Sequence, residues 1–172
     1  MNCDFSCEEF NQYRVDLPYP DVVLNLRNAY YAELISGAYA GRGSEMTAIT
    51  QYTFHNLYTD EYPDVFTAMK YIAIVETIHL RLLGKLIRQL GLIPKYMTYE
   101  TETYWNGAYP NSSIKIAEML AADLEGERGA VAHYRRLINQ IKNESIDGLF
   151  RRIILDEEKH IEVLTPLYDK YH

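Results

Sequence analysis

Glu76-Thr-Ile-His79 and Glu157-Glu-Lys-His160 place the same motif, Glu-x-x-His, in the two halves of a chain of 172 residues. Residues three apart on an α-helix lie on one face, so the carboxylate and the imidazole of each motif can bind one metal ion together. A single motif of this kind arises easily by chance in a chain with 5 His and 24 acidic residues. The second copy and its surroundings make the pattern informative.

A second pattern, Glu-x6-Tyr, precedes each motif: Glu45 with Tyr52, and Glu127 with Tyr134. Seven residues are about two helical turns, so each pair lies along one stripe of a helix, roughly 10.5 Å apart. The second Glu-x6-Tyr pattern follows the first by 82 residues, and the second Glu-x-x-His motif follows the first by 81. This near-constant offset indicates an internal repeat, in which each half is a helical hairpin that offers one Glu, then Glu and His.

The first half of the chain predicts two helices. The first covers about residues 29–58, although its glycines weaken it, and Ser44, a good N-cap residue, is a point at which it could begin again. The second covers residues 60–91, with Pro63 near its start, and its apolar residues recur every three or four positions. Residues 1–28 have mixed polarity and are expected to form an irregular N-terminal arm.

The second half predicts two more helices after a long connection. Residues 92–110 have no helical period, a third helix runs from a cap at residues 111–113 to about Asn143, and a fourth covers residues 146–171. Pro166 is expected to kink the fourth helix or to end it early. The sequence therefore predicts an all-α fold, a four-helix bundle of two antiparallel hairpins joined by a long crossover.

Composition and charge narrow the possible partners. The net charge of −7 disfavours nucleic acid and anionic membrane surfaces. No uncharged apolar run approaches the roughly 20 residues of a membrane helix, and the acidic residues 1–10 are unlike a signal peptide, so a cytoplasmic location is expected. The two cysteines, Cys3 and Cys7, are expected to be free thiols rather than a metal or redox pair, and they are too few for a four-cysteine iron site.

The repeat supplies the ligands that a pair of divalent ions needs. Two such ions carry four positive charges, and four ionised carboxylates neutralise them inside a core where uncompensated charge is costly. Glu76 and Glu157 are expected to bridge the two ions, whereas Glu45 and Glu127 are expected to bind one ion each. Asp123, one turn before Glu127, is a candidate acceptor for the second N–H of a ligand histidine. The six candidate ligands are Glu45, Glu76, His79, Glu127, Glu157 and His160.

Four stretches of the chain resemble the ferritin-like di-metal carboxylate superfamily: Ser44–Tyr52, Glu76–His79, Asp123–Arg128 and Glu157–His160. Single-domain rubrerythrin-like proteins are the most similar, bacterioferritin and manganese catalase are more distant, and the resemblance covers about residues 29–165. It implies a ferritin-like four-helix bundle over residues 29–172, after an arm of residues 1–28. It also implies that the six residues above bind two iron ions, with two manganese ions as the alternative cofactor.

Two departures from the rubrerythrin pattern bear on activity. A full rubrerythrin carries a rubredoxin-like iron domain with two Cys pairs, which this sequence lacks, so electrons would come from a separate donor such as a rubredoxin. Rubrerythrins also have a further Glu one turn beyond the ligand of the third helix, where this chain has Ala130. A peroxidase activity of the rubrerythrin type is therefore in question.

The leading functional prediction is a non-haem di-iron oxidoreductase that reduces hydrogen peroxide or dioxygen in defence against oxidative stress. A di-manganese site that dismutates peroxide is one alternative, and a ferroxidase centre for iron handling is another. A structural bundle with a vestigial site also remains open. Assembly into a homo-oligomer, such as a dimer, is expected.

Several aromatic and histidine residues are open to more than one interpretation. Tyr52 and Tyr134 either hydrogen-bond a ligand carboxylate, in support of catalysis, or simply fill the core. His55 and His133 lie outside the motifs and are expected at surface or core positions rather than on a metal. The aromatic residues between 96 and 109 could cover the site as a lid, although a subunit interface or packing over the bundle is the expectation.

Overall fold

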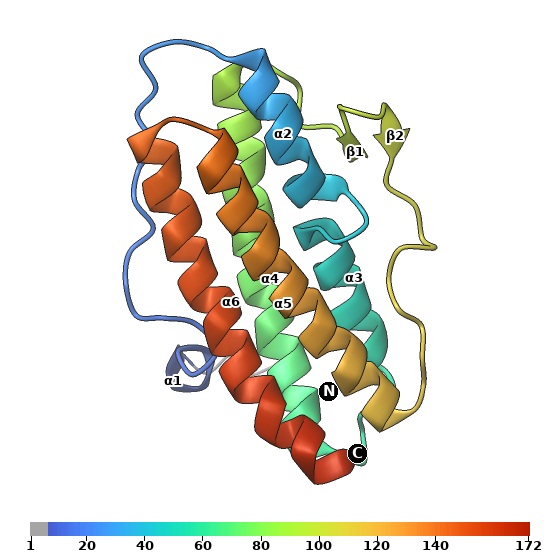
Figure 1. Cartoon of the computed structure of the whole chain (residues 1–172). Helices are drawn as coiled ribbons and strands as arrows, with labels where there is room; N and C mark the ends of the chain where they lie inside the picture. Colours follow the sequence, from blue (N-terminus) through green and yellow to red (C-terminus); the bar gives the residue numbers. More distant parts are fainter. Residues whose placement is uncertain (1–6) are drawn as a thin grey trace.

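Four helical segments lie side by side in the computed structural model of the chain (Figure 1). The first is broken into α2 (Ala29–Ala40) and α3 (Glu45–Asn56), which pack against α4 (Pro63–Leu90) to form one hairpin. The second hairpin consists of α5 (Ile116–Gln140) and α6 (Glu144–Tyr171). The prediction of an all-α four-helix bundle made of two hairpins is therefore confirmed.

The break between α2 and α3 has a local cause. The Gly41 N–H donates to the Gly37 carbonyl at 2.9 Å, and a Cβ added to Gly41 would lie 2.5 Å from that oxygen, so only glycine fits. Ser44 then caps a new helix, because its Oγ accepts a hydrogen bond from the Thr47 N–H at 3.3 Å. A single helix over residues 29–58 is wrong, and the new start at Ser44 is confirmed. This start places Glu45 in the first turn of α3.

The connection into α5 is longer than predicted. α4 ends at Gly91, whose φ of 109° lies in the left-handed region that glycine adopts without a side-chain clash. The predicted cap of α5 at residues 111–113 is wrong, since the Asn111 side chain accepts from the Ser113 N–H and the Ser113 hydroxyl donates to Glu118 Oε2 at 2.6 Å. These polar residues form a turn before the helix, which begins at Ile116.

α6 is continuous through its proline. Asn143 caps it by accepting from two N–H groups of its first turn, so this helix begins two residues earlier than predicted. The expected early end at Pro166 is wrong, because α6 continues to Tyr171. The Tyr171 hydroxyl donates to Asp64 Oδ1 at 2.9 Å, and Leu164 is fully buried, so packing on both sides of the proline offsets the one hydrogen bond that it removes.

The crossover between the hairpins contains two short strands. β1 (Met97–Thr98) pairs antiparallel with β2 (Thr103–Tyr104). The indole N–H of Trp105 donates to Thr47 Oγ1 at 3.0 Å, which ties the end of this segment to α3. The aromatic crossover thus packs along the side of the first hairpin and not over the end of the bundle (Figure 1), and its expected part in a subunit interface stays a prediction.

A polar layer divides the core at mid-height. Two hydrophobic clusters fill the bundle, one toward each end. On α4, the buried residues of one cluster end at Val75 and those of the other begin at Leu83. On α6, the two clusters are bounded by Ile154 and Leu164. Both Glu-x-x-His motifs fall between these boundaries. The apolar pattern of the helices therefore leaves one interior position for polar side chains.

The structure describes residues 7–172, beginning with the short helix α1 (Cys7–Phe10). Residues 11–28 then run along the α6 side of the bundle to the start of α2 (Figure 1). The prediction of free Cys3 and Cys7 thiols lies outside the described side chains, and the division into an arm and a bundle stays a prediction. Among the described helices, none combines the length and the apolar character needed to cross a membrane.

Candidate metal centre

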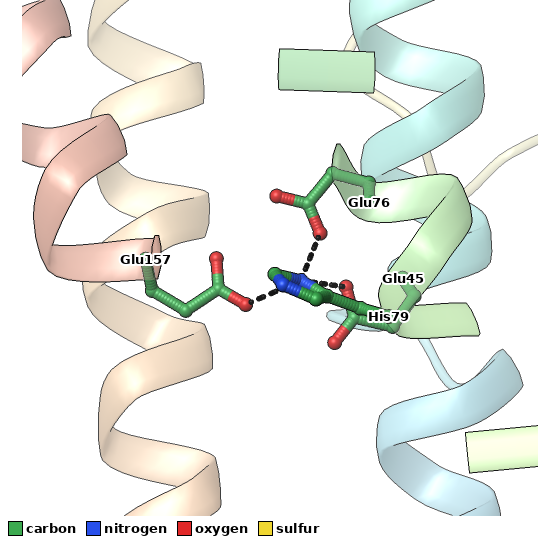
Figure 2. Close-up of side chains that lie close together, drawn as sticks. All are labelled: Glu45, Glu76, His79 and Glu157. Carbon is green, nitrogen blue, oxygen red and sulfur yellow. Dashed lines mark hydrogen bonds and ion pairs between the residues drawn. The ribbon is translucent and has the colours of Figure 1, made fainter. Parts of the chain in front are cut away.

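The six candidate ligands converge within the polar layer. Glu45 comes from α3 and Glu127 from α5, whereas α4 supplies Glu76 and His79 and α6 supplies Glu157 and His160. None of the six residues is more than 3% exposed. Figure 2 shows four of these side chains pointing toward one another across the space between the helices. The tertiary structure thus brings together every position that the repeat singled out as a metal ligand.

The six residues form two overlapping groups. In each group, four ligand atoms lie within 4.8 Å of one another. Glu45 and His79 belong only to the first group, and Glu127 and His160 only to the second. Both groups contain Glu76 and Glu157, the carboxylates that the sequence predicts as bridges. The geometry can therefore hold two neighbouring ions on one shared pair of carboxylates.

The Nδ1 atom of each motif histidine lies close to three carboxylates of its ligand group. His79 Nδ1 is 3.2 Å from Glu157 Oε1, 3.3 Å from Glu76 Oε2 and 3.9 Å from Glu45 Oε2. His160 Nδ1 is 3.0 Å from Glu76 Oε1, 3.3 Å from Glu127 Oε2 and 3.4 Å from Glu157 Oε2. Each imidazole nitrogen is thus surrounded by three carboxylates, and the two motifs make equivalent contacts.

Two buried tyrosines connect the halves of the repeat. The Tyr52 hydroxyl donates to Glu127 Oε1, and the Tyr134 hydroxyl donates to Glu45 Oε1, so each tyrosine holds the carboxylate of the opposite half. Burial, followed by the charge of the bonded carboxylate, raises the pKa of both tyrosines well above 10.0. Both hydroxyls therefore keep their protons and act as donors. Their support of catalysis stays a prediction.

Protons occupy the cluster when metal is absent. Burial and then Glu76 raise the pKa of Glu45 well above its ordinary value. For Glu127, burial and Glu76 outweigh the opposing charge of His160 and also raise the pKa. Burial lowers the pKa of both motif histidines, but the surrounding carboxylates outweigh it and raise their pKa well above 6.5. Divalent ions would take the place of these protons.

The outer nitrogen of His79 has partners that the sequence did not reveal. His79 Nε2 lies 3.1 Å from Asp156 Oδ2 and 3.3 Å from the Tyr19 hydroxyl, which itself donates to Asp156 at 2.6 Å. Burial raises the pKa of Tyr19 to about 12, so this hydroxyl stays protonated. A carboxylate on Nε2 directs the lone pair of Nδ1 toward the metal position. Asp156 directly precedes a motif Glu, but Tyr19 lies in the irregular arm and has no signal in the sequence.

The predicted role of Asp123 is wrong. Its two carboxylate oxygens both lie 3.0 Å from His55 Nδ1, and the Gln51 amide donates to Oδ1 at 2.8 Å. Asp123 shares the inward face of α5 with Glu127 but lies one turn away, where α3 offers His55 instead of a ligand histidine. His55 is fully buried and outside both ligand groups, in agreement with its expected core position.

A cavity of about 940 Å³ connects the cluster with the surface between α2–α3 and α5. Its lining includes Asp123, Glu125 and the four candidate carboxylate ligands, Glu45, Glu76, Glu127 and Glu157. Small residues of α5, including Gly126, Gly129 and Ala130, form part of its wall, and a Cβ at either glycine would meet no atom within 4 Å. The Tyr109 ring, with the Arg42 guanidinium 5.4 Å from its centre, also lines this cavity. A small substrate can therefore approach the cluster from this side.

The donor set fits divalent metal ions. Each group offers three carboxylates and one imidazole, ligands that suit iron and manganese. Both oxygens of Glu157 are buried and accept no well-directed hydrogen bond from the described residues. They form ion pairs with the two motif histidines, at 3.2 and 3.4 Å from Nδ1, and a divalent ion would replace these contacts when the histidines give up their protons. Two divalent ions would also balance the four carboxylates.

Comparisons with known proteins place this site in a family. Residues 42–171 match the family model of the ferritin-like domain, so the chain belongs to the ferritin-like family. All six candidate ligands lie within the matched residues. No curated protein sequence matches the chain.

Solved structures of the same fold include a catalase and two ferritin relatives. A manganese catalase from Anabaena superposes with a TM-score of 0.82 at 21% identity, covering 90% of this chain and 78% of that chain. A bacterioferritin from Rhodobacter capsulatus gives 0.69 at 24% identity, with 85% and 88% covered. A dodecameric thioferritin from Bacteroides fragilis gives 0.68 at 18% identity, with 84% and 88% covered. The superpositions show a shared fold, and a particular closeness to rubrerythrin stays a prediction.

The pKa shifts predict how the metal-free protein responds to pH. Because the pKa values of Glu45, Glu127, His79 and His160 are raised on folding, the folded chain holds more protons than the unfolded chain above about pH 4.5. The free energy of unfolding should therefore fall as pH rises, most steeply above about 6.5, by about 1.4 kcal/mol per pH unit for each proton of difference.

Urea unfolding with a chelator present, at several pH values between about 5 and 8, checks this dependence. The lowered pKa values of Glu76 and Asp156 contribute stability that is lost only in acid, as pH falls below their ordinary range. The lowered pKa of His133 opposes the slope only below about 6.5, where one proton of His133 stands against those of Glu45 and Glu127. A stability that rises steadily over the same interval would contradict the assignment of protons to the cluster.

Proposed function

We propose that the protein is a non-haem di-iron oxidoreductase that reduces hydrogen peroxide or dioxygen, and that this activity serves defence against oxidative stress. The observation that carries the proposal is the pair of buried ligand groups that share Glu76 and Glu157 beneath a cavity. Two redox-active ions held on one pair of carboxylates would supply two electrons to a single substrate molecule. Reduction of H2O2 to two water molecules takes up two electrons and two protons.

Each residue of the cluster has a role in this proposal. Glu76 and Glu157 would hold both ions, and each histidine would bind one ion through Nδ1. The tyrosine bonds occupy Oε1 of Glu45 and Glu127, which leaves Oε2 of each carboxylate facing a histidine and free to bind an ion. Because all six side chains are almost fully buried, the cavity is a path by which solvent or a small substrate reaches the ligands. At position 130, one turn beyond Glu127, the cavity wall carries the methyl group of Ala130 instead of a further carboxylate.

A di-manganese centre that dismutates peroxide is the second candidate. The observation that favours it is the superposition on the manganese catalase, whose TM-score of 0.82 exceeds the 0.69 of the bacterioferritin. Dismutation converts two H2O2 into two H2O and one O2, and it needs no external donor. Reduction by a di-iron centre does need a donor, and we propose a separate protein such as a rubredoxin.

Metal analysis and peroxide assays distinguish these functions. We expect protein purified without added metal to contain about two ions per chain, and the iron-loaded form to consume peroxide slowly alone and faster with an external reductant. Release of one O2 for every two H2O2 without a donor would instead identify a dismutase. Absence of iron, manganese and zinc after growth in metal-replete medium would overturn both candidates.

A charge-altering variant connects the activity to the cluster. Glu157→Gln keeps the shape of the bridging side chain and removes its charge, so peroxide consumption should be lost. If the unaltered protein consumes no peroxide but oxidises many Fe(II) ions per chain with O2, iron handling becomes the better assignment. We further propose a cytoplasmic location. We also propose assembly into a homodimer, and light scattering on the purified protein would test this oligomeric state.

A further inference from the structure

The N-terminal arm contacts the metal centre from behind His79. The Tyr19 hydroxyl donates to Asp156 Oδ2 at 2.6 Å and lies 3.3 Å from His79 Nε2, and the two rings meet edge to face with centres 5.9 Å apart. The Val15 N–H donates to the other oxygen, Oδ1, of Asp156 at 2.7 Å. One buried carboxylate thus binds both the arm and a candidate metal ligand.

Arg152 holds the same segment of the arm in place. Its Nη1 lies 2.8 Å from Asp156 Oδ2, while Nη2 and Nε donate to the carbonyls of Val15 and Leu17 at 2.6 and 2.9 Å. Its guanidinium carbon lies 4.4 Å from the centre of the Tyr19 ring. Because Arg152 is only 5% exposed and Asp156 is fully buried, the arm covers a charged pair that would otherwise face water.

The second half of the repeat lacks this arrangement. His160 Nε2 has no hydrogen-bond partner among the described residues. In the internal repeat, Val75 stands one residue before the first motif where Asp156 stands before the second. The two ion positions therefore share their bridging carboxylates but differ in what holds the outer nitrogen of the histidine.

We propose that Tyr19, acting through Asp156, is a positioning residue of the metal centre, and that docking of the arm and ion binding by the His79 group favour each other. The proposal rests on the proposed di-metal function. Tyr19 and Asp156 fix the ring of His79 with Nδ1 directed at Glu76 and Glu157. Coupling between two binding events is reciprocal, so an arm that strengthens ion binding is itself held more firmly by the ion.

Ion affinity provides the first test. Full-length protein is freed of metal with a chelator and titrated with Mn2+ by calorimetry. Outer partners of ligand histidines typically contribute 10–100-fold to metal affinity. We therefore expect Tyr19→Phe to weaken one of the two ions about 10-fold and to leave the other within about twofold, whereas Asp156→Asn should weaken the same ion by about 10–100-fold.

Two controls assign the effect to its position. Tyr171→Phe removes another tyrosine–carboxylate bond, 2.9 Å long, at the far end of α6, and it should leave both affinities unchanged. In a His160→Ala background, in which the ion of the His79 group is measured alone, Tyr19→Phe should retain its loss of about 10-fold. In a His79→Ala background the same change should have little effect.

Proteolysis provides an independent test of the reciprocal coupling. Trypsin cuts after Arg14, and the next residue, Val15, must release its bonds to Asp156 and Arg152 before the peptide bond is accessible. Mn2+ should slow this cut several-fold in the unaltered protein and much less in Tyr19→Phe. Cleavage after the exposed Lys95 of the crossover serves as the reference for general effects of the metal.

The outcomes separate this inference from the proposed function. An unaltered protein that binds no ions overturns both. Two ions bound with unchanged affinity in Tyr19→Phe and Asp156→Asn, or equal weakening of both ions, overturns the positioning role and leaves the di-metal proposal intact. A cut after Arg14 whose rate does not respond to Mn2+ contradicts the reciprocal coupling.

Discussion

Replacement of Glu76 by Ala is expected to abolish the binding of both metal ions, whereas replacement of Glu45 by Ala should weaken mainly one. Glu76 belongs to both ligand groups, and Glu45 only to the group that contains His79. Removing the shared carboxylate takes a ligand from each ion. It also removes a negative charge that reduces the repulsion between the two positive ions. Elemental analysis after dialysis against a weak chelator should find about two ions in the unaltered protein, about one in Glu45→Ala and none in Glu76→Ala.

The symmetry of the repeat provides matched controls. Glu157→Ala should behave like Glu76→Ala, and Glu127→Ala should behave like Glu45→Ala but affect the other ion. Equal losses from all four substitutions would show that the carboxylates do not divide into shared and single-ion ligands. Circular dichroism of each variant establishes whether the helices are retained before metal is measured.

Removal of the metal is expected to lower the stability of the fold strongly. A ligand that binds only the folded state adds about 4 kcal/mol when its free concentration is 1,000 times its dissociation constant, so two ions add about 8 kcal/mol. For a chain of this size that corresponds to a rise of roughly 15–30 °C in the midpoint of thermal unfolding. Scanning calorimetry with added Mn2+ and with excess chelator measures the difference.

The variant that lacks a shared carboxylate is again the control. Glu76→Ala should unfold at the same temperature with and without Mn2+, because it retains neither ion. If the midpoint of the unaltered protein does not respond to metal, the buried cluster is stable with its protons alone and metal binding is not part of its folding energetics.

The bundle and the candidate centre follow largely from the sequence. Helical periodicity identifies the residues of one helix that share a face, and the offsets of 82 and 81 residues between the halves place equivalent residues on equivalent faces. Four buried carboxylates repel one another unless cations lie between them, so the charge balance predicts two divalent ions. Glu76 and Glu157 are the carboxylates expected to be shared, whereas Glu45 and Glu127 are expected to bind one ion each. The two overlapping ligand groups repeat this division.

Helix boundaries were less predictable, because capping side chains compete with local alternatives. Ser44 was recognised as a cap, and α3 begins after it. The polar residues 111–113 predict the cap of α5, but the Ser113 hydroxyl donates to Glu118 instead. Pro166 forbids one backbone hydrogen bond, and only the contact of Tyr171 with Asp64 and the packing of α6 on its neighbours decided that the helix continues.

The partners around the ligands were decided by tertiary structure alone. Asp123 and Asp156 are both acids close in sequence to a ligand, yet one binds His55 and the other holds His79. Helical spacing shows that each lies on an inward face, but not which residue of another helix stands opposite. Tyr19 belongs to a segment without periodicity, so no pattern could place it against α6. Periodicity thus specifies which side of an element is buried, whereas contacts between elements far apart in the sequence depend on how the whole chain packs.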